Sequence, residues 1–147
     1  MNKIEARVRK IIEEYSTAEP EDICENMGII TLSQPLPACV NGFTVRMNDI
    51  PFIVINSSLD YHQKRVTMAH ELGHVVLHKG TNSIELSCNT SFCISKYEKE
   101  ADTFAAYLLM YAELSAFEGY ESLTVEELSR LAHIPVGMAQ YIRDELS

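Results

Sequence analysis

The sequence lacks any apolar run that approaches the length needed to span a bilayer. Its first residues include Lys3, Glu5 and Arg7, which make the segment too charged for the apolar core of a signal peptide. Internal repeats, low-complexity tracts and interdomain linkers are missing as well. We therefore expect a single domain, residues 1–147, that works in the cytoplasm and not in or on a membrane.

Positive charge is also scarce. The chain has 12 Lys and Arg against 21 Asp and Glu, which gives a formal net charge of −9. An acidic surface repels phosphate backbones, so we expect no direct nucleic-acid partner. The proportions of hydrophobic residues, 46%, and charged residues, 22%, are those of a globular protein with one sizeable core.

Cysteine is limited to four positions: Cys24, Cys39, Cys88 and Cys93. In a chain without an export signal these are most simply reduced thiols. Cys88 and Cys93 are separated by four residues, whereas common zinc knuckles separate their cysteines by two. A second metal site there is thus a minor alternative, and the role of the four thiols stays open.

The hydrophobic pattern predicts an α+β fold. Helical spacing of apolar residues predicts an N-terminal helix over 2–15, and three β-type runs lie within about 29–55. Further helices are expected over about 59–78, capped by Ser57 or Ser58, over about 96–113 and, in two pieces, over 125–146, where Thr124 and Glu127 form a capping box. Residues 80–94 are polar and lack periodicity, so we expect a loop over the site there. The simplest architecture is a helical domain with a small antiparallel sheet of about three strands.

The most informative stretch is His70-Glu71-Leu72-Gly73-His74, inside the helix predicted over about 59–78. Residues four apart on a helix share one face, so the two imidazoles can meet at one metal ion. Glu71 lies one position round, where it can hold a water as the general base without being a ligand. This H-E-x-x-H pattern predicts a zincin-like active-site helix.

Two histidines are too few for a catalytic zinc, which has three protein ligands and an open fourth position. Glu98, on the helix predicted over about 96–113, is the preferred third ligand. Asp102, four residues later, can accept the free N–H of a ligand histidine. Glu100 on the same helix is the rival third ligand, and Ser95 with Glu98 also reads as a helix-capping pair.

Two other histidines, His62 and His78, are alternative ligands. His78 continues the four-residue stripe from His74 but falls near the helix end, where a supporting role behind the ligands suits it better. His62, eight residues before His70, is expected to face solvent.

The combined motifs resemble the ImmA/IrrE metallo-endopeptidases over roughly residues 20–143. The matching positions are Ile55-Asn56, Ala69 to His74, Leu77-His78, Glu98, Ala101-Asp102, Phe104-Ala105-Ala106 and Leu108-Leu109-Met110. One departure is Tyr111, where the family usually has proline, so that this helix is expected to run on slightly.

The resemblance implies a small intracellular zinc peptidase of thermolysin-like design. Its Zn²⁺ ligands would be His70, His74 and Glu98, with Glu71 as general base and Asp102 behind a ligand. Several relatives cleave a phage, mobile-element or stress-response repressor, which suggests a repressor encoded nearby as the protein substrate. The oligomeric state is left open.

The implied chemistry is peptide hydrolysis by a zinc-activated water, with Glu71 carrying the proton to the leaving amine. The tetrahedral oxyanion also needs a hydrogen-bond donor. His78, Tyr97 and Tyr107 are the candidates, and the sequence does not choose among them.

Two alternatives compete with an active peptidase. One is an inactive family member that acts as a protein-binding regulator. The other is a DNA-binding helix-turn-helix within 127–146, where Gln140 and Arg143 are opposed by Asp144 and Glu145.

Overall fold

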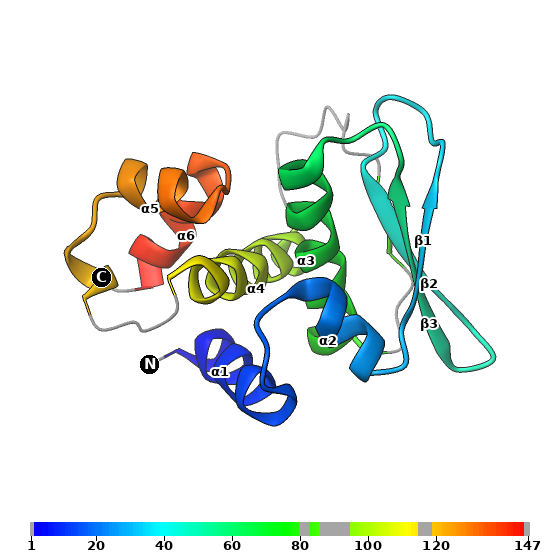
Figure 1. Cartoon of the computed structure of the whole chain (residues 1–147), viewed down its shortest axis with the longest axis horizontal. Coiled ribbons are helices and arrows are strands. Elements are labelled where there is room, and N and C mark those ends of the chain that lie inside the picture. Colours follow the sequence, from blue (N-terminus) through cyan, green and yellow to red (C-terminus); the bar gives the residue numbers. More distant parts are fainter. Residues whose placement is uncertain (1, 80–82, 86–94, 115–118, 146–147) are drawn as a thin grey trace.

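The computed structural model describes residues 2–79, 83–85, 95–114 and 119–145. Helices α3 and α4 form its centre: α3 packs on strands β2 and β3, and α4 packs on α3 and contacts α1, α5 and α6 (Figure 1). The helices are α1 Lys3–Tyr15, α2 Pro20–Asn26, α3 Tyr61–Leu77, α4 Lys96–Glu113, the 3₁₀ turn η1 Tyr120–Ser122, α5 Val125–Ala132 and α6 Val136–Glu145. The strands are β1 Ile30–Gln34, β2 Gly42–Met47, β3 Ile50–Asn56 and β4 Ser83–Glu85.

The α+β prediction is confirmed, with two differences in the sheet. The strand order is β1-β3-β2-β4, and β1 runs parallel to β3, so the sheet is mixed rather than antiparallel. The reason is a crossing connection. After β1 the chain crosses the end of β3, forms β2 on the far side and turns through the β2–β3 hairpin into β3. Strand β3 therefore lies between β1 and β2 and runs in the same direction as β1. Buried Asn56 fixes this connection, because its side-chain amide donates to the Val40 carbonyl at 2.8 Å.

The second difference is β4, a short strand that pairs with β2 within a segment predicted as a loop over 80–94. The rest of that predicted loop lies outside the described residues, and so do Cys88 and Cys93. Cys24 and Cys39 are free thiols in the structure.

The helix boundaries follow their caps. Asp60 and Gln63 form a capping box at the start of α3, two or three residues after the predicted serine caps. Ser95 caps α4 through the backbone N–H of Glu98, and Thr124 with Glu127 forms the predicted capping box of α5. These caps fix which side chains stand in the first turn of each helix.

Gly73, the glycine of the H-E-x-x-H stretch, sets how closely α3 and α4 approach. A Cβ at this position would lie 3.1 Å from the carbonyl oxygen of Ala101 and 3.2 Å from Cβ of Phe104. The close crossing brings the first turns of α4 beside the histidines of α3. A buried cluster that includes Leu72, Phe104 and Leu108 holds the crossing in place.

Helix α4 runs through Tyr111 to Glu113, as the missing proline predicts. The Tyr111 hydroxyl donates to Oε1 of buried Glu5 at 2.6 Å, and the Tyr120 hydroxyl donates to the same oxygen at 2.8 Å. Arg9 forms an ion pair with this carboxylate at 3.3 Å. The residue that replaces proline therefore ties α1 to the end of α4.

Candidate metal centre

Two imidazoles and one carboxylate converge where α3 crosses the start of α4. The Nε2 atoms of His70 and His74 lie 3.2 Å apart. The Glu98 carboxylate spans them, with one oxygen 2.7 Å from Nε2 of His74 and the other 3.3 Å from Nε2 of His70. The structure thus brings together the three residues predicted as ligands.

Asp102 stands behind His70, one turn after Glu98 on α4. Its Oδ1 lies 2.7 Å from Nδ1 of His70. If Nδ1 carries the proton and donates it to the carboxylate, the lone pair of Nε2 points at the cluster, as a metal ligand requires. This contact is the one that the predicted role of Asp102 requires, and the role itself stays a prediction.

A second chain of contacts stands behind His74. Its Nδ1 lies 3.0 Å from Nδ1 of His78, and Nε2 of His78 lies 3.1 Å from Oε1 of Glu100. His78 is buried at the end of α3. Glu100, the rival third ligand, therefore contacts His78 rather than the Nε2 atoms of the cluster.

Glu71 is buried beside the cluster, with its side chain turned toward β2. Oε1 accepts a hydrogen bond of 2.7 Å from the Thr44 hydroxyl, and Oε2 lies 3.8 Å from Nε2 of His70. Ligand atoms of His70, Glu71 and His74 lie within 4.8 Å of one another. One carboxylate oxygen is thus held by the sheet while the other faces the imidazoles.

Thr44 is the site residue that the sequence analysis missed. A threonine in a strand gives no local signal of a functional role, because threonine is common in strands for structural reasons. Its contact with Glu71 depends on the packing of β2 against α3, which no local pattern reveals.

The electrostatics reflect a crowded set of opposite charges. Burial lowers the pKa of His70, but hydrogen bonds to Asp102 and Glu98 outweigh it and raise the value to about 10. Burial alone would raise the pKa of Glu98, yet its hydrogen bonds with His70 and His74 lower it to about 2. Burial raises the pKa of Glu71. The carboxylates thus stabilise positive charge between the two histidines.

This donor set fits a divalent metal. Two neutral imidazole nitrogens and one carboxylate form a known protein shell of catalytic zinc, with a fourth position left for water. The excess of carboxylate charge around the imidazoles favours a cation. Proton and metal would compete for the same nitrogen atoms.

The structure distinguishes among the three candidate oxyanion donors. Tyr107 is wrong for this role, because it is fully buried and its hydroxyl accepts a hydrogen bond of 2.8 Å from Asn2, away from the cluster. His78 is also badly placed, since its two ring nitrogens contact His74 and Glu100. Tyr97 remains: it is 57% exposed and its ring lies edge-on to His78 at 4.6 Å.

His62 and the predicted helix-turn-helix lie outside the cluster. His62 stacks on His133 of the α5–α6 turn, with ring centroids 4.1 Å apart. On α6, the Gln140 amide donates to Asp144, and the Arg143 guanidinium donates to the carbonyl of Glu121 at 2.7 Å. Gln140 and Arg143, the polar residues of the helix-turn-helix alternative, therefore form hydrogen bonds within the protein.

Comparison with known proteins gives an independent view of the chain. The profile of the family described as Peptidase_M78, IrrE N-terminal-like domain, matches residues 24–141. The chain is 29% identical over 136 residues to "Uncharacterized immunity region protein 2" of Bacillus phage phi105, covering 92% of this chain and 86% of that protein. It is 26% identical over 142 residues to "Metallopeptidase ImmA" of Bacillus subtilis (strain 168), covering 94% and 82%.

Proposed function

This chain belongs to the IrrE N-terminal-like peptidase family, and we propose that it is a zinc-dependent endopeptidase that cleaves a transcriptional repressor. The single observation that carries the proposal is the convergence of His70, His74 and Glu98 beside the buried carboxylate of Glu71. Three ligands and an adjacent base are the parts that metal-assisted hydrolysis requires.

His70, His74 and Glu98 would hold the metal, and Asp102 would orient His70. When bound, Zn²⁺ supplies a Lewis acid that polarises the scissile carbonyl and lowers the pKa of water. Glu71 accepts a proton from the attacking water at the oxygen that faces His70 and passes it to the leaving amine. The Thr44 hydroxyl keeps the other oxygen in place, so that the proton is taken and delivered from one position.

Tyr97 is the candidate donor for the developing oxyanion. It lies in the first turn of α4, one residue before Glu98, and its side chain is exposed. Of the three residues considered for this role, Tyr97 has the placement that leaves its hydroxyl accessible to a substrate.

A repressor is proposed as the substrate because of the relatives. One carries the name of a phage immunity region and another that of a metallopeptidase. On this basis a regulatory protein is the proposed substrate, and a repressor encoded beside this gene would be the first candidate. The cytoplasm is the proposed location; among the described residues no helix has the length and apolarity to cross a bilayer.

Co-expression with the neighbouring repressor tests this proposal. We expect repressor fragments with the wild-type chain and intact repressor with Glu71→Gln, in which the amide cannot accept the proton. Both proteins should contain equal metal. Cleavage that survives Glu71→Gln would contradict the proposed chemistry, and an uncut repressor that co-purifies with both proteins would favour the inactive-regulator alternative.

A further inference from the structure

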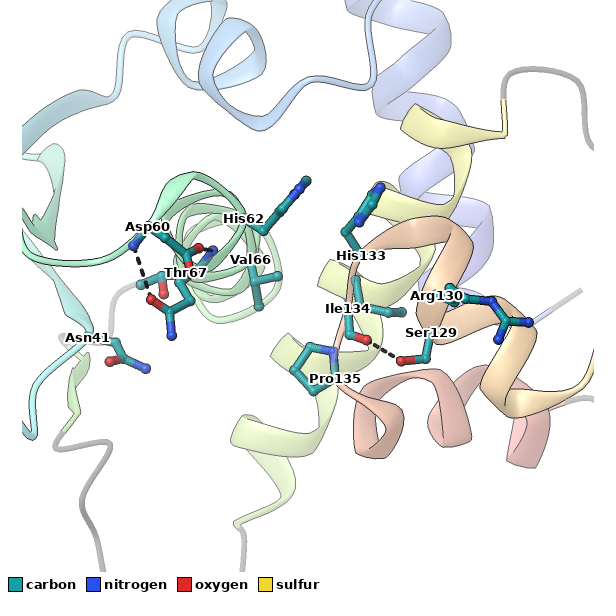
Figure 2. A pocket seen from close by; sticks show the side chains of 11 residues that line it. Asn41, Asp60, His62, Val66, Thr67, Ser129, Arg130, His133, Ile134 and Pro135 are labelled. Carbon is teal, nitrogen blue, oxygen red and sulfur yellow. Dashed lines mark hydrogen bonds between the residues drawn. The ribbon is translucent and has the colours of Figure 1, made fainter.

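A pocket of about 590 Å³ lies between the first turns of α3 and the turn that joins α5 to α6 (Figure 2). Val66 and Thr67 line it from α3, and Ile134 and Pro135 line it from the turn. Its volume is within the range of pockets that bind small ligands or side chains. None of its lining residues has a role in the proposed hydrolysis.

Two of the lining residues lie on the same side of α3 as residues of the metal centre. Val66 lies four residues before His70, and Thr67 lies four residues before Glu71, so each pair is one helical turn apart. One turn advances about 5.4 Å. A peptide held at the metal centre would therefore bring a neighbouring side chain within reach of the pocket.

Most of the exposed wall area of the pocket is apolar, although the polar residues Asn41, Gln63, Thr67 and Ser129 also line it. Val66, Ile134 and Pro135 contribute only hydrocarbon side chains. The two charged lining residues are directed elsewhere: the Asp60 carboxylate accepts the backbone N–H of Gln63 at 2.8 Å as the helix cap, and Arg130 extends away from α3 (Figure 2). Among the described residues that line the pocket, neither charged group would pair with a charged substrate side chain in this space.

Two imidazole rings lie at the rim of the pocket. His62 and His133 face each other with centroids 4.1 Å apart and planes 11° apart, and both residues are exposed (Figure 2). His133 has a left-handed backbone, φ 55°, at the end of α5. The Ser129 hydroxyl donates to the Ile134 carbonyl at 2.6 Å and braces the turn below it. Aromatic rings stack or pack edge-on against such a surface.

We propose that this pocket binds a bulky aromatic side chain of the protein substrate next to the scissile bond. The proposal rests on the proposed peptidase function for its biological meaning, because the pocket would then select the cleavage position. Binding itself does not require cleavage, which makes the two ideas separable by experiment.

The binding test uses the full-length Glu71→Gln protein and follows the imidazole proton resonances of His62 and His133 by NMR. N-acetylphenylalanine amide is the probe, since it has no carboxylate to compete for the metal, and N-acetylaspartate amide is the charged comparison. We expect saturable shifts of both histidines with the phenylalanine probe. Absence of such shifts, or equal shifts with the aspartate probe, would overturn the proposal.

Three variants locate the binding. Val66→Phe should fill the pocket and abolish the shifts, whereas Val136→Phe makes the same change at a position that is 52% exposed and outside the pocket lining, and should keep them. His133→Asn removes one rim ring while asparagine tolerates the left-handed backbone, and should weaken the shifts of His62. If Val66→Phe fails to fold, the His133→Asn result decides the question.

The specificity test uses a mixed peptide library with the wild-type enzyme and the Val66→Phe variant. Wild type should cleave next to aromatic residues, and Val66→Phe should lower kcat/KM for those sites at least about tenfold relative to sites with small residues. An unchanged preference in Val66→Phe would overturn the proposal. If the wild-type enzyme cleaves no peptide and no repressor, the peptidase function fails while the binding test still reports on the pocket.

Discussion

The Thr44 hydroxyl donates a hydrogen bond of 2.7 Å to the Glu71 carboxylate from across the α3–sheet interface. Both residues are buried, with 2% of each exposed. The contact links a strand to the residue of the H-E-x-x-H stretch that is not a proposed ligand. In the proposed mechanism two tasks are therefore separate: α3 and α4 would hold the metal, and β2 would orient the base.

Thr44→Val tests this division. Valine keeps the shape of threonine but cannot donate, so Glu71 should lose its fixed position. A hydrogen bond to a charged group is worth about 1.5–3 kcal/mol, so we expect kcat to fall roughly ten- to hundredfold in the repressor cleavage assay. Thr44→Ser, which keeps the hydroxyl, should stay near wild type, and both variants should retain the metal. Equal loss in the two variants would mean that packing matters rather than the hydrogen bond.

Metal content distinguishes the ligands from their neighbours. His70→Ala, His74→Ala and Glu98→Ala should each lose bound zinc, because each removes one of the three donors. Glu100→Ala should keep it, since that carboxylate contacts His78. Elemental analysis of the purified proteins gives the answer. Retention of metal in Glu98→Ala together with loss in Glu100→Ala would reverse the choice of third ligand.

Sequence patterns predicted the parts of this molecule that repeat at helical spacing. The stripe through His70 and His74 and the pairing of Glu98 with Asp102 depend on local periodicity, and the structure places these side chains together. The parallel β1–β3 pairing and the Thr44 contact could not be predicted in this way, because they depend on how distant segments pack. The prediction of Tyr107 as an oxyanion donor failed for the same reason. The position of a residue on a helix does not reveal which neighbour its buried hydroxyl contacts, and here that neighbour is Asn2.

Asp102→Asn should weaken metal binding without abolishing it. The carboxylate at 2.7 Å from Nδ1 of His70 fixes the ring and increases its basicity. An amide can rotate to keep a hydrogen bond but carries no charge, so we expect roughly a ten- to hundredfold rise in the Kd for zinc. Competition titration with a chelating dye measures it. An affinity equal to that of wild type would show that Asp102 serves only the packing of α3 on α4.

The buried Glu5 carboxylate predicts a cost for changing Tyr111. Tyr111→Phe removes one of its two tyrosine donors, and we expect a loss of about 1–3 kcal/mol in the free energy of unfolding. Tyr111→Pro, the residue usual in the family, should cost more here, because it also removes a backbone donor from within α4. Urea unfolding compares the two, with zinc binding as the control for the intact site. A Tyr111→Pro protein as stable as wild type would contradict this account.

Alkaline pH should destabilise the protein, because some buried groups keep their proton in the folded chain at pH values where the unfolded chain has lost it. Burial raises the pKa of the Cys24 thiol from 9.0 to about 12, with a further contribution from the nearby Glu21 carboxylate. Between these values the unfolded chain has lost the proton that the folded chain keeps, so the free energy of unfolding falls as pH rises. The slope for one such proton is about 1.4 kcal/mol per pH unit. Burial also raises the pKa of Tyr107 to about 12, which steepens the fall above its ordinary value of 10.0.

Urea unfolding of the wild-type protein and of Cys24→Ala at pH 8, 9, 10 and 11 measures this slope. Cys24→Ala lowers stability at pH 8, because it removes a buried side chain, but alanine has no proton to lose. The gap between the two proteins should therefore narrow as pH rises above about 9. Parallel stability curves over the whole range would mean that the Cys24 thiol ionises as readily in the folded chain as in the unfolded one.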